Sequence, residues 1–243
     1  MNIYIKDLRK AFGEKVAVDI DTYEVKHGEM MGLVGNNGAG KTTLFRLMLD
    51  LLKADSGNVE YQFTAEEGET PTIIDPSLSE EWKSHTGAYI DDGFLIDFLT
   101  PEEYFDFIGK VSGLDKTETE NRIHEYDHLM AGEILDQKKL IRDFSAGNKQ
   151  KIGIISALLH RPELVILDEP FNFLDPSSQN VLKHTLVDYN KTTGATIIIS
   201  SHNLAHTIDI CPRIILLEHG KIVKDLSNEN HSAEEELNAY FDQ

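Results

Sequence analysis

The feature that most constrains this chain is a glycine-rich loop at residues 35–42, which has the sequence GNNGAGKT. It follows a short apolar run at 30–34 and precedes a segment, 43–52, with a helical pattern. Glycines allow backbone turns that a Cβ forbids, so successive N–H groups can point at phosphate oxygens, and the helix N-terminus adds partial positive charge. A strand, this loop and a helix in that order form the phosphate-binding loop G-x-x-x-x-G-K-[ST]. The sequence therefore predicts that the chain binds a nucleoside triphosphate.

Two side chains of this loop bring chemistry of their own. We expect Lys41 to reach the β- and γ-phosphates and the Thr42 hydroxyl to ligate Mg²⁺. The alternative is a glycine-rich turn with a solvated lysine, which the flanking strand and helix make the weaker interpretation. The residues expected to contact the nucleotide here are Gly35, Asn36, Asn37, Gly38, Ala39, Gly40, Lys41, Thr42 and Thr43.

Composition limits the partners of the chain. Its net charge of −19 argues against general nucleic-acid binding, which needs a basic surface. No apolar stretch approaches the roughly 20 residues that span a bilayer, so we expect no direct membrane insertion. The single cysteine, Cys211, rules out an internal disulfide and fits a reducing cytosol, and we expect it to be structural. With 243 residues the chain is long enough for one large α/β domain, with or without a subdomain.

Strand patterns occupy both ends of the chain. Residues 1–34 are expected to form two or three strands and 58–63 another, and the acidic segment 64–70 is expected to be a surface loop. Continuous β-branched runs suit a sheet that is covered on both faces. Three such runs follow Pro162, at 164–167, 195–199 and 214–217.

Between these parts the pattern is helical. Thr100 and Glu103 form a capping box around a proline at the first helical position, and further helices are expected from about residue 117 and after Ser145. The sequence thus predicts a single domain whose α/β core, residues 1–97 and 151–243, is interrupted by a helical insertion at about 98–150.

Two carboxylates stand directly after the buried run 164–167. In parallel α/β sheets the ligand chemistry lies at the carboxyl ends of the strands. We expect Asp168 to hold Mg²⁺, directly or through water, and Glu169 to lie near the γ-phosphate and polarise the attacking water. The alternative is a strand that ends in a solvated turn, but the phosphate loop upstream favours the catalytic interpretation.

Two further segments carry polar residues at the ends of expected elements. Ser145 and Gly147 lie at the start of a helix, a combination that can form a second anion site. His202 follows the run 195–199 and is placed to reach a γ-phosphate. The second anion site is separate in sequence from the phosphate loop, so it can serve another face of a phosphate.

Together these motifs resemble the ATP-binding cassette (ABC) family, specifically the ATPase subunit of an ABC transporter, over nearly the whole chain. In family order they are Walker A at 35–42, the signature at 145–150, Walker B at 164–169, the D-loop around 172–175 and the switch histidine at 202. The signature form is similar to that of the subgroup that works with ABC-2 type or bacitracin-type exporters. The resemblance implies an α/β P-loop NTPase fold with a RecA-like mixed or parallel sheet core, an N-terminal antiparallel β subdomain and an inserted α-helical signature subdomain.

The resemblance also implies a site built from two chains. Two cassettes pair head to tail, and each ATP lies between the phosphate loop of one and the signature of the other. Ser145 and Gly147 would contact the γ-phosphate held by the partner, and Asp175 of the D-loop joins the ATP-binding residues. Phe12 matches the position that stacks on adenine; the alternative for Phe12 is a core aromatic at the end of a strand.

On this resemblance the chain is an active ATPase that uses ATP and Mg²⁺. The implied catalytic residues are Lys41, Glu169, His202 and Asp91, and the implied metal ligands are Thr42, Asp168 and Asp91. Hydrolysis would separate a homodimer and drive a membrane permease encoded separately, with export as the expected direction. The expected location is cytoplasmic, at the inner face of the cell membrane through the permease.

Some positions depart from the family pattern. Asp91 stands where a glutamine is usual, and Phe173 stands where the D-loop usually has glycine. Ala146 and Asn148 replace the common glycine and glutamine of the signature. Two alternatives therefore stay open: a soluble ABC-type ATPase acting on ribosomes or DNA, and a cassette kept as an ATP sensor with little turnover.

Two histidine pairs have the i, i+4 spacing that can bind zinc on a helix. They are His124 with His128, and His202 with His206. Neither pair has the intervening glutamate of a metalloprotease motif or an evident third ligand. We expect solvated residues on helix faces instead of zinc ligands.

Overall fold

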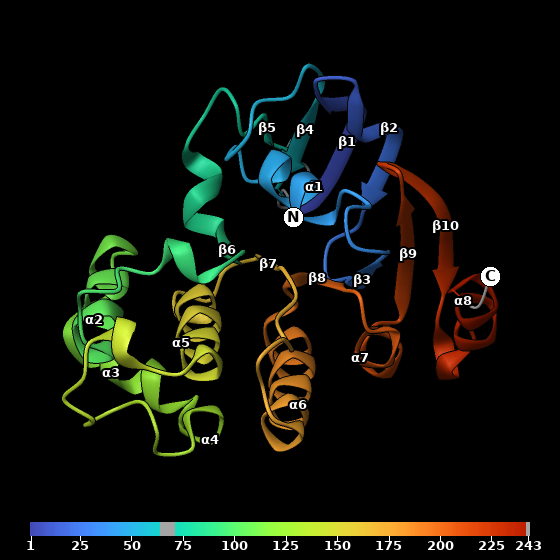
Figure 1. Ribbon diagram of the computed structural model, residues 1–243. Coiled ribbons are helices and arrows are strands. Elements are labelled where there is room, and N and C mark those ends of the chain that lie inside the picture. Colours follow the sequence, from blue (N-terminus) through green and yellow to red (C-terminus); the bar gives the residue numbers. More distant parts are fainter. Residues whose placement is uncertain (64–70, 242–243) are drawn as a thin grey trace.

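The computed structural model describes residues 1–63 and 71–241, arranged as two sheets with helices around them (Figure 1). The segment 64–70, for which the sequence predicts a surface loop, lies outside the described residues. The first sheet is antiparallel, with the strand order β2-β1-β4-β5. Its strands are β1 (Asn2–Phe12), β2 (Lys15–Val25), β4 (Ser56–Gln62) and β5 (Ile73–Ile74). This sheet is the N-terminal antiparallel subdomain that the family resemblance implies.

The second sheet has the strand order β10-β9-β3-β8-β7-β6. Its strands are β3 (Met30–Val34), β6 (Thr86–Tyr89), β7 (Leu164–Leu167), β8 (Thr196–Ser201), β9 (Arg213–Glu218) and β10 (Lys221–Ser227). The strands from β9 to β6 run parallel, and β10 pairs antiparallel with β9 at one edge. Because the carboxyl ends of parallel strands share one edge of a sheet, the residues that follow β3, β7 and β8 meet there.

Helices cover both faces of the second sheet. The helices of the described residues are α1 (Lys41–Met48), α2 (Pro101–Val111), α3 (Lys116–His124), α4 (Asp127–Met130), α5 (Ala146–Leu158), α6 (Pro176–Thr193), α7 (Leu204–Ile210) and α8 (Glu234–Phe241), with 3₁₀ turns η1 (Glu81–His85), η2 (Asp92–Phe94), η3 (Ile141–Asp143) and η4 (Glu229–His231). In Figure 1, α1 lies on the side of the antiparallel sheet, and α5, α6 and α7 lie on the opposite side. The green helices α2, α3 and α4 gather beside α5 at one end of the molecule.

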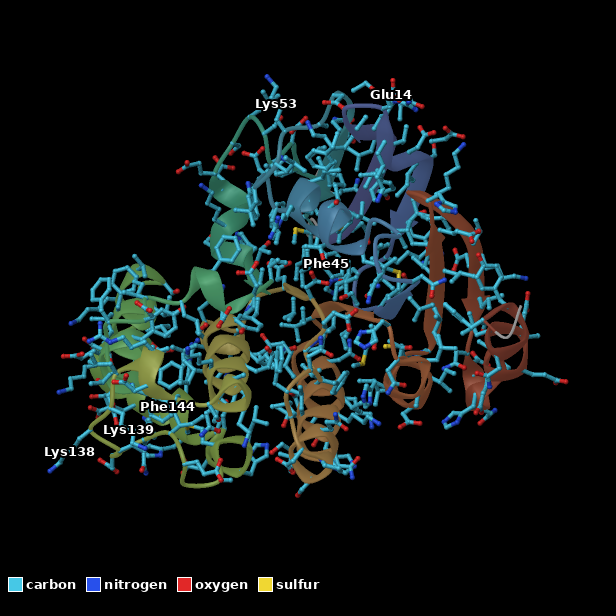
Figure 2. All side chains as sticks on the ribbon, viewed as in Figure 1. Glu14, Phe45, Lys53, Lys138, Lys139 and Phe144 are labelled. Atoms are coloured by element: carbon cyan, nitrogen blue, oxygen red, sulfur yellow. The ribbon has the colours of Figure 1, made fainter. Side chains whose placement is uncertain are left out.

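The central strands feed two hydrophobic cores. Leu164 and Ile166 of β7 belong to the core shared with α1 and the antiparallel sheet, whereas Val165 and Leu167 belong to the core shared with the helices on the other face. Phe45 of α1 is fully buried in the first core and lies near the middle of the molecule in Figure 2. Burial on both faces is the reason that these strands have uninterrupted apolar sequences.

The sequence predictions for two helix ends have different outcomes. The predicted capping box is confirmed: Thr100 Oγ1 accepts a hydrogen bond from the Glu103 N–H, and the Glu103 carboxylate accepts one from the Thr100 N–H. The prediction of a helix at 43–52 was wrong at the C-terminal end, because α1 ends at Met48. Asp50 has a φ of 50°, a left-handed conformation that cannot continue an α-helix.

Candidate nucleotide-binding and catalytic site

The phosphate loop joins β3 to α1 and is packed too tightly for side chains at two of its glycines. A Cβ on Gly40 would lie 2.2 Å from the Ala17 carbonyl oxygen, and the φ of Gly40 is 113°, which other residues rarely adopt. A Cβ on Gly35 would lie 2.3 Å from the Leu217 carbonyl oxygen. These contacts with β2 and β9 fix the course of the loop at the carboxyl edge of the sheet.

Lys41 is the first residue of α1, and it is buried, with 6% of its surface exposed. Its Nζ donates a hydrogen bond of 2.6 Å to the Gly35 carbonyl oxygen and lies 3.6 Å from Glu169 Oε1. The ammonium thus lies across the loop, beside the carboxylate that the sequence predicts as catalytic. Because the site is partly desolvated, this positive charge attracts anions more strongly than it would in water.

Asp168 lies between two hydroxyl groups. Its Oδ2 accepts a hydrogen bond of 2.5 Å from Thr42 Oγ1, and its Oδ1 accepts one from Ser200 Oγ. Burial raises the pKa of Asp168, and the hydrogen bonds from the two hydroxyls oppose that rise. Thr42 and Asp168 therefore present oxygen atoms side by side, which are the ligands that Mg²⁺ prefers. These residues fit the Mg²⁺ site that the sequence predicts.

Glu169 has a left-handed backbone conformation, with a φ of 48°. Its N–H donates to Ser200 Oγ at 2.8 Å, and its carbonyl oxygen accepts from Gln150 Nε2 at 3.1 Å. The side chain is held on both sides, because Oε1 faces Lys41 while Oε2 accepts from the His202 N–H at 3.2 Å and lies 2.8 Å from His202 Nδ1. The structure thus brings the predicted lysine, glutamate and histidine together.

A pocket of about 290 Å³ opens over the phosphate loop. Phe12 lines it and is 54% exposed, which excludes the alternative of a core aromatic. Lys15, a residue that the sequence analysis missed, lines the same pocket, and its Nζ lies 3.7 Å from the place of a Cβ on Gly38. The complete lining is Phe12, Lys15, Ala17, residues 37–43 and Glu169. A larger hollow of about 570 Å³, between α2 and α3, contains none of the predicted site residues.

The predicted signature residues do not line the phosphate-loop pocket. Ser145 caps α5, and its Oγ accepts a hydrogen bond of 3.2 Å from the Asn148 N–H. Gly147 packs against the D-loop of the same chain, since a Cβ there would lie 2.7 Å from the Phe173 carbonyl oxygen. Phe173 is 74% exposed and has a φ of 64°, which gives a physical reason for the glycine that is usual at this position.

Asp175, predicted to contact ATP, caps α6 in this structure. Its carboxylate accepts hydrogen bonds from the Ser177 N–H at 2.9 Å, the Ser178 N–H at 3.1 Å and the Ser178 hydroxyl at 2.6 Å. These bonds, with that of the Ser178 hydroxyl foremost, lower the pKa of Asp175. Asp175 therefore positions the D-loop at the start of α6, and its contact with ATP stays a prediction.

Asp91 has no hydrogen bond or ion pair with Thr42 or Asp168, although the family resemblance implies that the three are metal ligands. One of its carboxylate oxygens lies 3.2 Å from an Arg46 nitrogen, and the other accepts from the Gly93 N–H at 2.9 Å. Arg46 is about one helical turn beyond Thr42 on α1. The ion pair thus holds Asp91 beside the site and outside the pocket lining, and no contact here supports its predicted catalytic and metal-binding roles.

Most of the histidines with helical spacing contact polar side chains in place of a shared metal site. His128 Nε2 lies 3.0 Å from Thr185 Oγ1, and His124 Nδ1 lies 3.1 Å from a carboxylate oxygen of Asp127. Burial lowers the pKa of His206. Within residues 1–63 and 71–241, no group of three or more His, Cys, Asp or Glu side chains is arranged to hold a metal ion.

Several known proteins and one family model are similar to this chain. The family described as ABC transporter matches residues 18–172. The bacitracin transport ATP-binding protein BcrA of Bacillus licheniformis is 33% identical over 224 residues, covering 90% of this chain and 68% of that protein. The methionine import ATP-binding protein MetN of Rhizobium johnstonii is 31% identical over 224 residues, covering 92% of this chain and 60% of that protein. A solved structure of the ATP-binding subunit of an ABC transporter matches with a TM-score of 0.83 and 25% identity, covering all of both chains.

The fold and the phosphate loop define this chain as a P-loop NTPase with a mixed α/β core. The chain belongs to the ABC transporter family, in which it is an ATP-binding cassette and an ATPase. None of the helices in the described part of the chain combines the length and the apolar character needed to cross a membrane.

Proposed function

We propose that this chain is the ATP-hydrolysing subunit of an ABC exporter and that it works as an ATP-dependent homodimer on a separately encoded permease. The observation that carries the proposal is the separation of the predicted ATP contacts. Phe12, Lys41 and Thr42 line one pocket, whereas Ser145 and Gly147 do not. A second copy placed head to tail would bring its signature to this pocket and complete the site.

Each copy would bind ATP through the phosphate-loop pocket. The adenine would stack on the exposed ring of Phe12, and the phosphates would lie against the loop between Lys41 and Lys15. Lys41 would exchange its hydrogen bond with the Gly35 carbonyl oxygen for bonds to the β- and γ-phosphates. Thr42 and Asp168 would hold Mg²⁺, which when bound neutralises phosphate charge.

Hydrolysis would use the residues at the ends of β7 and β8. Glu169 is suited to act as the general base, accepting a proton from the attacking water on a carboxylate oxygen. His202, whose Nδ1 lies 2.8 Å from Glu169 Oε2, would hold that carboxylate and face the γ-phosphate. Lys41 would stabilise the negative charge that develops on the transferred phosphoryl group. Residues 1–97 and 151–243 would form this catalytic core, and about 98–150 would carry the signature.

The similarity to BcrA and the form of the signature support export as the direction. MetN, which is named as an import protein, is nearly as similar. Overall similarity is therefore nearly equal to the bacitracin transport protein and to the import protein, and the form of the signature carries the preference for export. Direction and cargo would be properties of the permease, which would also hold this chain at the inner face of the cell membrane.

Size-exclusion chromatography of Glu169→Gln with light scattering tests the two-chain site. This variant keeps the volume of the side chain but removes the general base, so bound ATP would persist. We expect a monomer without nucleotide and a dimer with ATP in the absence of Mg²⁺. The matched control is Lys41→Ala in the same Glu169→Gln background, which should stay monomeric. A Glu169→Gln protein that binds ATP and stays monomeric would contradict the proposal.

An ATP sensor with little turnover is a second candidate. The ion pair of Asp91 with Arg46 favours it, because it keeps an acidic side chain away from the Mg²⁺ ligands. Measuring steady-state turnover beside equilibrium ATP binding separates the two functions: a subunit that powers transport turns over, and a sensor binds with negligible turnover. The net charge of −19 and the transporter relatives do not favour a ribosome- or DNA-bound ATPase.

A further inference from the structure

One buried hydroxyl connects Asp168 and Glu169, the two carboxylate residues that follow β7. Ser200, near the carboxyl end of β8, is fully buried. Its Oγ donates to Asp168 Oδ1 and accepts from the Glu169 N–H at 2.8 Å. A serine hydroxyl can donate one hydrogen bond, and here Asp168 accepts it. Ser200 therefore contacts both residues at once, although it does not line the nucleotide pocket.

The first bond determines which way the Asp168 carboxylate faces. With Oδ1 bound to Ser200, the other oxygen, Oδ2, is directed to Thr42 Oγ1 at 2.5 Å. Oδ2 and the Thr42 hydroxyl are the two oxygens that the proposed function assigns to Mg²⁺. Without Ser200, Oδ1 would be a buried acceptor lacking its hydrogen bond, and the carboxylate would rotate or shift to regain one.

The second bond holds the backbone from which Glu169 projects. Glu169 has a φ of 48°, a left-handed conformation that a non-glycine residue keeps only when its surroundings enforce it. Ser200 fixes its N–H, and Gln150 Nε2 fixes its carbonyl oxygen at 3.1 Å. This turn directs the carboxylate toward Lys41 and His202.

We propose that Ser200 is a positioning residue for ATP hydrolysis, which orients the Mg²⁺-binding oxygen of Asp168 and the carboxylate of Glu169 through one hydroxyl. The inference rests on the proposed roles of Asp168 and Glu169. It adds a residue that neither binds nucleotide nor carries a proton in the reaction. Residues that orient metal ligands typically contribute about 10- to 100-fold to affinity or activity.

The test compares Ser200→Ala with Thr196→Val. Thr196 lies at the other end of β8, is equally buried, and its hydroxyl also accepts from a backbone N–H, that of Gly28 at 3.0 Å. Both changes remove a buried hydroxyl from the same strand, but only Ser200 contacts Asp168 and Glu169. The readouts are the melting midpoint, kcat and KM for MgATP, affinity for ATP without Mg²⁺, and Mn²⁺ binding by electron paramagnetic resonance with a non-hydrolysable ATP analogue.

For Ser200→Ala we expect kcat and Mn²⁺ affinity to fall about 10- to 100-fold, while affinity for Mg²⁺-free ATP stays within about threefold. Thr196→Val should keep kcat and Mn²⁺ affinity near wild type. Ser200→Thr, which restores the hydroxyl, should recover most of the loss. Ser200→Ala with the kcat and Mn²⁺ affinity of Thr196→Val would overturn the proposal, as would an equal loss of Mg²⁺-free ATP affinity, which indicates a collapsed pocket.

Ser200→Cys covers the case in which the alanine variant does not fold. It fills the site with a thiol that bonds weakly, so its losses should resemble those expected for alanine. Wild-type kcat in a folded Ser200→Cys protein would also overturn the proposal. If the wild-type protein itself has no turnover, the proposed ATPase-driven transport fails, but the Mn²⁺ comparison still decides the role of Ser200.

Discussion

Replacing Gly147 with alanine tests the contact between the signature and the D-loop within one chain. The new Cβ would lie 2.7 Å from the Phe173 carbonyl oxygen. An ordinary carbon–oxygen contact is about 3.3 Å, so the D-loop backbone would have to retreat by about 0.6 Å. Overpacking of this kind costs about 1–3 kcal/mol. In a chain of this size the melting midpoint should therefore fall by about 2–12 °C.

Differential scanning calorimetry of Gly147→Ala, Phe173→Gly and the double variant measures this effect. A left-handed conformation costs about 1–2 kcal/mol in a residue with a Cβ, and Phe173→Gly removes that cost. It also lets the D-loop backbone move away from the new Cβ. The double variant should thus lose less stability than Gly147→Ala alone, with a coupling of at least about 0.5 kcal/mol. Ala146→Ser, at an exposed neighbouring position, is the control and should stay within about 0.5 kcal/mol of wild type. A Gly147→Ala midpoint within about 1 °C of wild type would refute the reasoning.

Three further substitutions and one labelling experiment test other contacts. Glu169→Gln should lower ATP turnover roughly 10²–10⁴-fold while sparing ATP binding, and near-normal turnover would contradict the general-base role. Asp175→Ala removes the N-cap of α6, so the midpoint of urea unfolding of the variant should fall below that of wild type. An unchanged midpoint would show that the cap does not contribute to stability. Because the hydrogen bond from Arg213 lowers the pKa of Asp225, the stability that Asp225 adds is present above the ordinary Asp pKa of about 3.9 and lost as pH falls through the lower folded value. Asp225→Asn should then destabilise at pH 7 and match wild type at about pH 2, and equal losses at both pH values would contradict this. Burial raises the pKa of Cys211, so a thiol reagent should label it quickly only in urea; rapid labelling of native protein would argue against a buried, inert thiol.

The parts of the fold with strong local signals were predictable from the sequence. The phosphate loop, the capping box at Thr100 and the buried runs that became β7, β8 and β9 all combine residue type with spacing. β6 and β10 were not predicted. β6 contains Gly87, whose missing Cβ lets the Ala157 carbonyl oxygen of α5 approach, and β10 alternates between exposed and half-buried residues with several charges. Both strands are therefore stabilised by their neighbours in the sheet more than by their own composition.

The same distinction holds for the site. Lys41, Glu169 and His202 belong to motifs with fixed spacing, and the structure brings them together. Asp91 was assigned by its resemblance to a family position, but its carboxylate forms an ion pair with Arg46 on α1, which no sequence pattern linked to it. Ser200 was missed because a serine near the end of a strand has many uses. Its hydrogen bonds to Asp168 and Glu169 join residues that are far apart in the sequence, so only the folded structure reveals them.

In the proposed dimer, each active site takes its phosphate loop from one chain and its signature from the other. Mixing two inactive variants tests this arrangement most directly: Lys41→Ala, which lacks the phosphate-loop lysine, and Ser145→Arg, which blocks the signature. In a head-to-tail dimer, each mixed pair contains one site made only of unchanged parts. An equal mixture should then recover about a quarter of the wild-type turnover, since half of the pairs are mixed and each has one of two sites. If both variants fold and their mixture remains as inactive as either alone, the two-chain site is contradicted.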